Sequence, residues 1–423
     1  MSCVRLFSLV CIVLALPGWG YAQSETPSHS ERVEALRPYV TPLRSVDPSD
    51  EDFSDLAPLK DLIRDRRMII LGEPTHGDGT AFLAKSRLVK FLHREMDFDV
   101  LAFETGLYDL RWATAQASST EEYVQAAAEN LSRPWAQSKQ ARPVLRYAAQ
   151  TTQTNDSLHL AGIDIATRHE SVFRRQLRAH LERNDLWQSH LIDANIETPI
   201  RKLLANPMYR PDSTTYRQFV EGLRELADQL RGGNGKDVFW AQMIENVDAM
   251  AQTAWERRYG PRNRQMADNL AWLAREAYSG EKVIVWVASS HGIRNLSSIE
   301  RINADRSYEG QTSMGDYLAN RFGGGIYTLG VTAHEGTYGA FYWEQQESQK
   351  ISPPSKNSLE DLLGALSYDY SLLDFTTVPD SHWLSQPQVA RPLGYEEMRA
   401  DWTTVMDGML FIRSMEPNTK IQD

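Results

Sequence analysis

Glutamate, aspartate and histidine side chains follow four short, largely apolar runs of the sequence, and these residue types suit acid–base chemistry. The pairs are 68–71 with Glu73 and His76, 100–103 with Glu104, 158–163 with Asp164, and 283–288 with His291. A neutral histidine accepts a proton from water near neutral pH when a carboxylate fixes its tautomer and stabilises the imidazolium. The set therefore predicts a site that activates water.

His76 is the strongest candidate for the general base, with Glu73 or Glu104 as the carboxylate that orients it. A single Gly-Glu-x-x-His pattern is weak evidence, because a loop histidine that bonds a turn carbonyl looks the same. The repetition of the pattern at four runs favours the functional interpretation.

The apolar runs themselves predict the elements that position these residues. They lack helical spacing and stop abruptly at turn-forming residues, as in Gly72-Glu73-Pro74-Thr75, so they indicate short buried strands. In open α/β sheets, ligands bind at the carboxyl ends of the strands. We expect the four strands to be parallel neighbours and their polar ends to share one cleft.

Two further residues are candidates for catalysis. Arg87 lies on the helix predicted over 81–96, where it is a plausible partner for Glu104, either in the site or as a purely structural ion pair. His291 follows two serines and precedes Gly292, and it could polarise a carbonyl, protonate a leaving alkoxide or bind a metal. The structural alternative is a histidine in a turn.

Three residues are candidates for substrate binding. Asp164 has the weakest case, since it could simply cap the next segment. Arg264 and Asn269 lie on a predicted helix that begins near Arg262, and we expect an arginine or asparagine of this helix to point into the cleft. The alternative for Arg264 is a surface pair with Asp268 four residues later.

The order of predicted elements indicates an α/β fold, with a central mainly parallel sheet, flanking helices and a large helical insert. We expect a poorly ordered lead-in over 23–50 and one domain over 51–423, with the insert at about 171–279. Further strands are expected at 326–332, 338–343 and 408–413.

The first 22 residues have the features of a secretory signal peptide, with Arg5, an apolar run over 6–16 and a small-residue site ending at Ala22. Cleavage there would remove both cysteines, Cys3 and Cys11, so no cysteine nucleophile would remain. The formal net charge of −11 and the absence of a basic stripe argue against nucleic acid as a partner. We expect a periplasmic or secreted protein without a membrane anchor.

Several common chemistries lack their motifs. The sequence has no Gly-x-Ser-x-Gly elbow, no His-Glu-x-x-His, and neither the Walker nor the dinucleotide glycine pattern. What remains is a histidine and carboxylate site that activates water unaided or through a metal.

Motifs in a fixed order extend over most of the chain. They are Gly72-Glu73-Pro74-Thr75-His76-Gly77, Arg87, Ala102-Phe103-Glu104, Gly162-Ile163-Asp164, Met266-Ala267-Asp268-Asn269, 286–291, 314–318, 326–330 and 407–412. Together they resemble the erythromycin esterase family. The resemblance implies a non-serine α/β hydrolase that opens a lactone with water activated by His76, with Glu73 nearby and no required metal. A weaker resemblance extends to haem-binding and metal-dependent peptidase relatives.

Three positions depart from the pattern of that family. Ala288 stands where a site histidine is usual, Asn263 replaces the aspartate of an Arg-Asp pair, and Lys139 stands at an acidic position. These changes leave His76 in place and alter its surroundings, so macrolides are not assumed to be the substrate.

Three functions follow from the sequence. The first is a hydrolase of small-molecule esters or lactones without a cofactor, in which Glu73 and Glu104 balance His76, and Arg87 and His291 act on the carbonyl. The second places zinc or manganese on His76, Glu73, Glu104 and His291. The third is a protein that binds haem or a hydrophobic small molecule without turnover. The sequence does not indicate an oligomeric state.

Overall fold

The computed structural model describes residues 27–115, 117–186, 196–302, 305, 307–339 and 347–421. The predicted signal peptide over 1–22 lies outside the described residues. In the described part of the chain, no helix combines the length and the apolar composition needed to cross a membrane.

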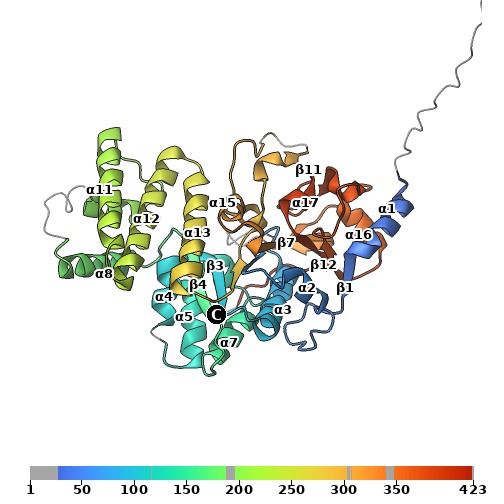
Figure 1. Ribbon diagram of the computed structural model, residues 1–423, viewed down its shortest axis with the longest axis horizontal. Helices are drawn as coiled ribbons and strands as arrows, with labels where there is room; N and C mark the ends of the chain where they lie inside the picture. Colours follow the sequence, from blue (N-terminus) through green and yellow to red (C-terminus); the bar gives the residue numbers. More distant parts are fainter. Residues whose placement is uncertain are drawn as a thin grey trace, which may run out of the picture.

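A mainly parallel sheet forms the centre of the molecule (Figure 1). From β12 to β4 the strands are parallel, and β9 and β1 add antiparallel pairs at one edge. The order across the sheet is β1 (Val40–Leu43), β9 (Tyr370–Asp374), β12 (Gly408–Met415), β7 (Ile326–Tyr338), β2 (Met68–Leu71), β5 (Val283–Trp286), β3 (Val100–Gly106) and β4 (His159–Asp164), with β8 (Gln349–Lys350) paired to β7.

The central strands are apolar because both of their faces are covered. In β2, Met68 and Ile70 join one hydrophobic cluster, whereas Ile69 and Leu71 join another on the opposite face. Successive side chains of a strand point to opposite faces, so a strand buried on both sides is a continuous apolar run. This explains why the polar residues that follow each run stood out in the sequence.

Helices cover the two faces of the sheet. One face packs against α3 (Gly79–Met96), α5 (Thr120–Asn130) and α7 (Arg142–Thr151), and the other against α13 (Gly260–Trp272) and α15 (Met314–Phe322). The shorter elements around them are α2 (Pro58–Ile63), α4 (Leu107–Thr114), α6 (Arg133–Ala136), α14 (Ser289–Gly292), η4 (Leu296–Ser298) and η5 (Gly323–Gly325).

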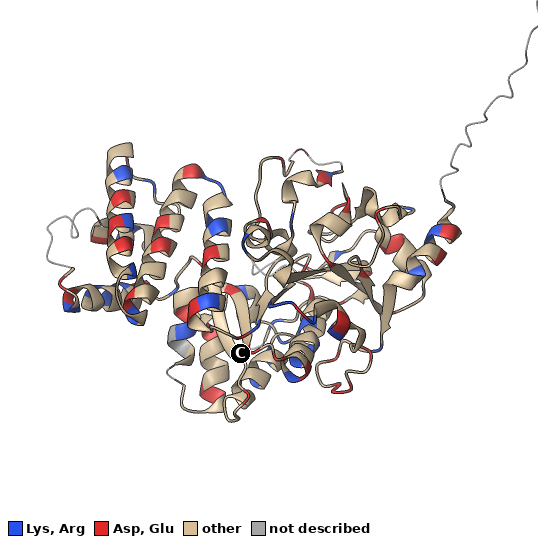
Figure 2. Cartoon of the chain, viewed as in Figure 1, with Lys and Arg blue, Asp and Glu red and all other residues tan. Residues whose placement is uncertain are grey.

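Between β4 and β5 the described chain is helical and extends away from the sheet, in green and yellow in Figure 1. The helices are α8 (Glu170–Arg183), α10 (Thr198–Ala205), α11 (Ser213–Arg231), α12 (Gly235–Glu256), α13 and the π-helical η3 (Leu273–Ala277). Figure 2 shows acidic and basic residues interspersed along these helices, whereas the central strands are almost free of charge. Within this group, α13 contacts β4 of the sheet.

A third hydrophobic cluster lies at the antiparallel edge of the sheet. It is formed largely by the last part of the chain, with α1 from the beginning packed on it. Its elements are α1 (His29–Leu36), η1 (Arg37–Tyr39), α16 (Leu359–Ala365), η6 (Trp383–Ser385), α17 (Trp402–Val405) and a small sheet of β10 (Gln388–Ala390), β11 (Met398–Ala400) and β6 (Glu300–Arg301).

The structure corrects the prediction of a poorly ordered lead-in for residues 27–50, whereas residues 23–26 lie outside the described residues. From residue 27 onward this segment is ordered, because Ser28 and Glu31 form a capping box that starts α1, and β1 pairs with β9. The predicted strand over 338–343 is also wrong in its start, since β7 continues through Tyr338 and 340–343 lie outside the described residues.

The β2–α3–β3 unit has the expected parallel strands, but they are not adjacent. β5 lies between β2 and β3 and pairs with both. The four polar-ended strands are nevertheless contiguous, in the order β2, β5, β3, β4. The expectation that they are parallel neighbours is confirmed.

Candidate active site

The carboxyl ends of the four contiguous strands bring the predicted residues together. Glu73 and His76 follow β2, Glu104 lies within β3, Asp164 ends β4, and His291 lies in α14 just after β5. Charge interactions connect them across the rim, since both His76 and His291 act on the pKa of Glu104. The site lies where an α/β sheet offers a crevice.

Glu73 is fully buried and holds two side chains, one with each carboxylate oxygen. Its Oε1 lies 3.1 Å from His76 Nδ1, and its Oε2 accepts a hydrogen bond from Lys85 Nζ. A carboxylate accepts but does not donate, so His76 Nδ1–H is the donor and Nε2 is the basic atom of the ring. Glu73 therefore selects the tautomer that a general base needs.

The charges around His76 adjust its proton affinity. Burial alone would lower the pKa of His76, but the hydrogen bond that its ring donates to Glu73 and the negative charge of Glu104 raise it above the ordinary 6.5. Lys85 acts in the opposite direction. Burial also lowers the pKa of Lys85, to about 8, although Glu73 favours its charged form.

A tight loop fixes His76 against the rest of the rim. Asp78 accepts hydrogen bonds from Thr75 N at 2.7 Å and from Tyr395 Oη at 2.9 Å. Gly77 is required because a Cβ atom there would overlap the carbonyl oxygen of Gly339. Burial raises the pKa of Asp78 to about 7.

Arg262, from the first turn of α13, lies at the centre of the other half of the site. Its Nε and Nη2 donate to the two carboxylate oxygens of Asp164 at 2.9 and 2.7 Å, and Nη2 also donates to Glu104 Oε1 at 2.9 Å. Bidentate pairing of this kind fixes both position and orientation. Arg262 thus ties the helical insert to β3 and β4.

The Nε2 atom of His291 lies between a donor and an acceptor. Arg262 Nη1 is 3.1 Å away and Glu104 Oε1 is 3.2 Å away. A neutral ring accepts from Arg262 at Nε2, and a protonated ring donates to Glu104 from the same atom. On the other side, Asn263 Nδ2 donates to the carbonyl of Thr312, so Asn263 Oδ1 accepts from His291 Nδ1–H at 2.7 Å.

Glu104 remains ionised in this environment. Burial alone would raise the pKa of Glu104, but His291 and Arg262 outweigh burial and hold the pKa well below 4.5. The second carboxylate oxygen accepts from the backbone N–H of Ala288 at 3.1 Å. Ala288 therefore contributes its backbone to the site, although its side chain cannot replace a histidine.

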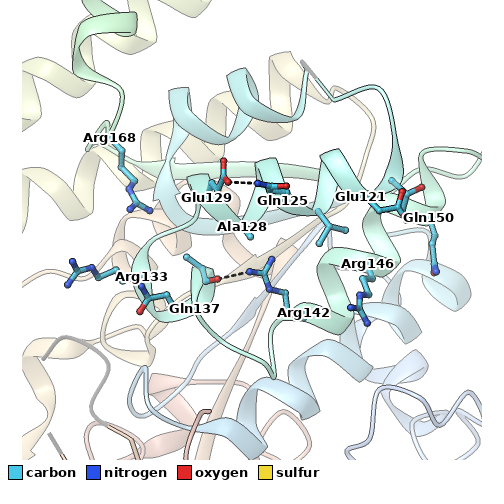
Figure 3. A pocket seen from close by; sticks show the side chains of 13 residues that line it. Glu121, Gln125, Ala128, Glu129, Arg133, Gln137, Arg142, Arg146, Gln150 and Arg168 are labelled. Carbon is cyan, nitrogen blue, oxygen red and sulfur yellow. Dashed lines mark hydrogen bonds between the residues drawn. The ribbon is translucent and has the colours of Figure 1, made fainter. Parts of the chain in front are cut away.

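Trp135 on α6 packs edge-on against His76, with 5.0 Å between ring centroids. The same short helix borders a separate cavity of about 890 Å³ between α5 and α7 (Figure 3). Arg133, Arg142 and Arg146 are among its lining residues, whereas His76 and Glu104 are not. This cavity is a neighbour of the site and does not contain the reacting groups.

Arg87 is not part of the site, which corrects the sequence prediction. It is buried on the opposite side of α3, where it donates to both carboxylate oxygens of Asp55 at 2.7 and 2.9 Å. It also donates to the backbone carbonyls of Ser45 and Asp52. Arg87 anchors the early segment of the chain, and the partner expected for Glu104 is Arg262 instead.

The structure also corrects the substrate-binding predictions for Arg264 and Asn269. Arg264 is exposed and lines a groove between α11, α12 and α13. Asn269 is fully buried and donates to Ile163 O at 2.7 Å and to Asn246 Oδ1 at 2.9 Å. Asp164 belongs to the site, where both of its carboxylate oxygens accept hydrogen bonds from Arg262.

Sequence reasoning missed the roles of Lys85, Arg262, Asn263 and Trp135. From the sequence, Arg262 marks only the start of a helix from which an arginine or asparagine is expected to point into the cleft, and Asn263 is only a departure from the family pattern. A polar pair at the first turn of a helix beside the sheet was the available signal. Lys85 lies on a helix that is buried on most of its faces, so its position carried no comparable signal.

A model of the erythromycin esterase family matches residues 93–415. The chain belongs to the erythromycin esterase family. The hydrolase YbfO of Bacillus subtilis strain 168 is 24% identical over 414 residues, covering 89% of this chain and 90% of that protein. Erythromycin esterase type II of Escherichia coli is 22% identical over 377 residues, covering 78% and 86%.

Solved structures show the same fold. A histidine-to-asparagine mutant of erythromycin esterase EreC, in its open conformation, superimposes with a TM-score of 0.66 at 14% identity, covering 91% of this chain and all of that one. The α/β class predicted from the sequence is confirmed. Membership of the family supports a hydrolase that acts on a small molecule.

Proposed function

We propose that this protein hydrolyses carboxylic esters or lactones with water that His76 activates. The observation that carries the proposal is the Glu73–His76 hydrogen bond of 3.1 Å at the carboxyl end of β2. It directs the proton of the ring to Nδ1 and presents Nε2 as the base. With 15% of its side chain exposed, His76 remains accessible to water.

The reaction follows from these positions. His76 Nε2 takes a proton from water as the oxygen attacks the carbonyl carbon, which gives a tetrahedral oxyanion. Collapse of this intermediate breaks the bond to the alkoxy oxygen, which must receive a proton to leave as an alcohol. The products are a carboxylic acid and an alcohol, joined in one molecule when the substrate is a lactone.

His291 is the proposed donor of that proton. Its surroundings hold the negative charges of Glu104 and Asp164 against the single positive charge of Arg262. A proton on His291 Nε2 faces Glu104 Oε1 at 3.2 Å, and once that proton is given up Arg262 Nη1, 3.1 Å away, can donate to the same nitrogen. The side chain of His291 is 14% exposed, which leaves an edge for a substrate.

The proposed reaction proceeds without a metal, because positive side chains already accompany the carboxylates that the sequence offered as ligands. Glu73 is paired with Lys85, and Glu104 is paired with Arg262. A divalent cation bound there would face a buried ammonium and a guanidinium. These carboxylates therefore suit a reaction that uses the charges of Lys85 and Arg262 better than they suit the binding of zinc or manganese.

We take the substrate class, a carboxylic ester or lactone, from the family, but we do not take from it a preference for macrolides. Asn263 contacts His291 directly, so the departure at this position changes a residue that touches the site. We propose a small ester or lactone as the substrate.

We also propose that the protein is exported to the periplasm or the medium, because its first 22 residues have the features of a signal peptide. Intact-mass measurement of the protein recovered outside the cytoplasm tests cleavage after Ala22.

The test of the proposed function is hydrolysis of a panel of alkyl esters, aryl esters and macrolactones. The wild type, His76→Ala and the control His29→Ala, which removes a half-buried histidine at the start of α1, are assayed with and without chelator. We expect turnover that His76→Ala abolishes and that chelator and His29→Ala leave unchanged. Normal turnover by a folded His76→Ala protein contradicts the mechanism, and activity that chelator removes and added metal restores supports the metal-dependent alternative.

A further inference from the structure

A second cluster of ligand-type side chains lies at the opposite ends of the same strands. His93 is in the last turns of α3, Asp99 directly precedes β3, and Asp156 lies in the loop before β4. His93 Nε2 is 3.8 Å from Asp99 Oδ1 and 3.6 Å from Asp156 Oδ1. These are the only three such residues in the described chain whose ligand atoms gather in this way.

The imidazole of His93 is buried and has one satisfied nitrogen. Its side chain is 1% exposed, Nδ1 lies 2.7 Å from Tyr147 Oη, and within the described residues Nε2 has no hydrogen-bond partner. When the Tyr147 hydroxyl accepts from Nδ1–H, Nε2 carries the lone pair and can bind a metal, as in most metal-binding histidines.

Several carboxylates gather around this nitrogen and could attract a cation. His93 Nε2 faces Asp99 and Asp156, and a further carboxylate, Glu281, lies beside Asp99. In a tetrahedral zinc site with ligand distances of about 2.1 Å, neighbouring ligand atoms are about 3.4 Å apart. The observed 3.6 and 3.8 Å exceed that spacing only slightly, so small side-chain movements suffice for coordination.

We propose that His93, Asp99 and Asp156 bind one divalent transition-metal ion, zinc or manganese, with water completing its coordination. One nitrogen and two carboxylate oxygens suit either metal. Asp156 is largely exposed and leaves a path from solvent. The ion links the end of α3 to the starts of β3 and β4.

The proposed site is structural and separate from the hydrolytic site. Glu104 lies four residues beyond Val100, about 13 Å along β3 at roughly 3.3 Å per residue. Metal at the amino ends of the strands therefore does not contact a substrate at the carboxyl ends. Binding to the folded state alone raises the thermal unfolding temperature.

The test is direct binding of ZnCl2 and MnCl2 to the mature protein after removal of metal with chelator. Isothermal titration gives the affinity, and Co2+ absorption in the visible range reports direct coordination. We expect one ion per chain, with binding weakened at least tenfold in His93→Gln and in Asp99→Asn. The same titration in His76→Ala excludes metal at the hydrolytic site as the source of the signal.

Asp97→Asn is the matched control for charge. Asp97 is exposed in the same loop and has a φ of 58°, which asparagine tolerates, so the variant removes one negative charge and keeps the backbone. We expect Asp97→Asn to bind metal as the wild type does. Should His93→Gln fail to fold, Asp156→Asn replaces it, because that side chain is exposed.

Three results overturn the proposal. They are no binding at micromolar metal, binding that His93→Gln and Asp156→Asn leave unchanged, and equal weakening by Asp97→Asn and Asp99→Asn. The last result identifies a diffuse acidic surface in place of a coordination site. Because the hydrolysis assay reports on His76 and the titration on His93, failure of one proposal is distinguishable from failure of the other.

Discussion

The two histidines at the rim of the sheet are held by different groups. His76 donates from Nδ1 to a carboxylate, Glu73, whose charge is balanced by Lys85. His291 donates from Nδ1 to a neutral amide, Asn263, and its Nε2 lies between Arg262 and Glu104. The same side chain is therefore placed in two distinct electrostatic surroundings at one rim of the sheet.

We propose that this difference separates a base from an acid. A carboxylate at Nδ1 stabilises the imidazolium that forms when His76 takes a proton, so His76 is suited to accept one. His291 has a neutral amide at Nδ1, and its Nε2 lies between Arg262 and Glu104, so we assign it the role of proton donor. Each of the following predictions tests this division of roles.

The largest effect is expected from His76→Asn. Asparagine removes the basic atom and keeps a polar side chain of similar length, so we expect kcat to fall by about 10³-fold or more for every ester. Steady-state kinetics on alkyl and 4-nitrophenyl esters measure this loss. A loss that depends strongly on the leaving group contradicts the role of a base for water.

His291→Asn tests the acid. An alkoxide from an alkyl ester needs a proton to leave, whereas 4-nitrophenolate does not. We expect kcat to fall by about 10²-fold for alkyl esters and by much less for 4-nitrophenyl esters. Equal losses for both substrates indicate that His291 acts in another way.

The pH dependence tests the charges that surround His76. The base works unprotonated, so kcat/KM falls as pH falls through the pKa of His76, and we expect the midpoint above 6.5. Because Glu104 raises this pKa and Lys85 lowers it, Glu104→Gln should move the midpoint down and Lys85→Met should move it up.

Profiles between about pH 5 and 9 show both shifts, with circular dichroism to confirm folding. Glu221→Gln, on the outer surface of the insert, is the control for loss of a distant carboxylate and should leave the midpoint unchanged. Shifts of the same sign in Glu104→Gln and Lys85→Met contradict the assignment of the midpoint to His76.

The smallest effect is expected from Asn263→Asp, which makes the surroundings of His291 resemble those of His76. The added carboxylate favours the imidazolium and makes it a weaker acid, so kcat for alkyl esters should fall by about two- to fivefold. Hydrolysis of 4-nitrophenyl esters in the same assay is the internal control and should not change.

Much of the site could be predicted from the sequence, for a simple physical reason. A parallel strand covered on both faces is apolar throughout, so the first polar residues after it mark the rim of the sheet. Glu73, His76, Glu104, Asp164 and His291 were found in this way, and the structure brings them together. Their grouping required only that β2, β5, β3 and β4 be neighbours.

What the sequence by itself determined is therefore the set of rim residues, the α/β class and the resemblance to a family. The tertiary structure alone decided their partners. Lys85 and Arg87 are two residues apart on α3, about 200° around the helix, so one reaches Glu73 and the other Asp55. Because most faces of α3 are buried, the apolar period did not show which cation faced the site.

Arg262 gives the same lesson over a longer range. It is 98 residues from Asp164 in the sequence, and only the packing of α13 against β4 brings the two together. Local patterns report which side chains a strand presents at its end. They do not report which distant charge meets them, because that depends on how the layers pack.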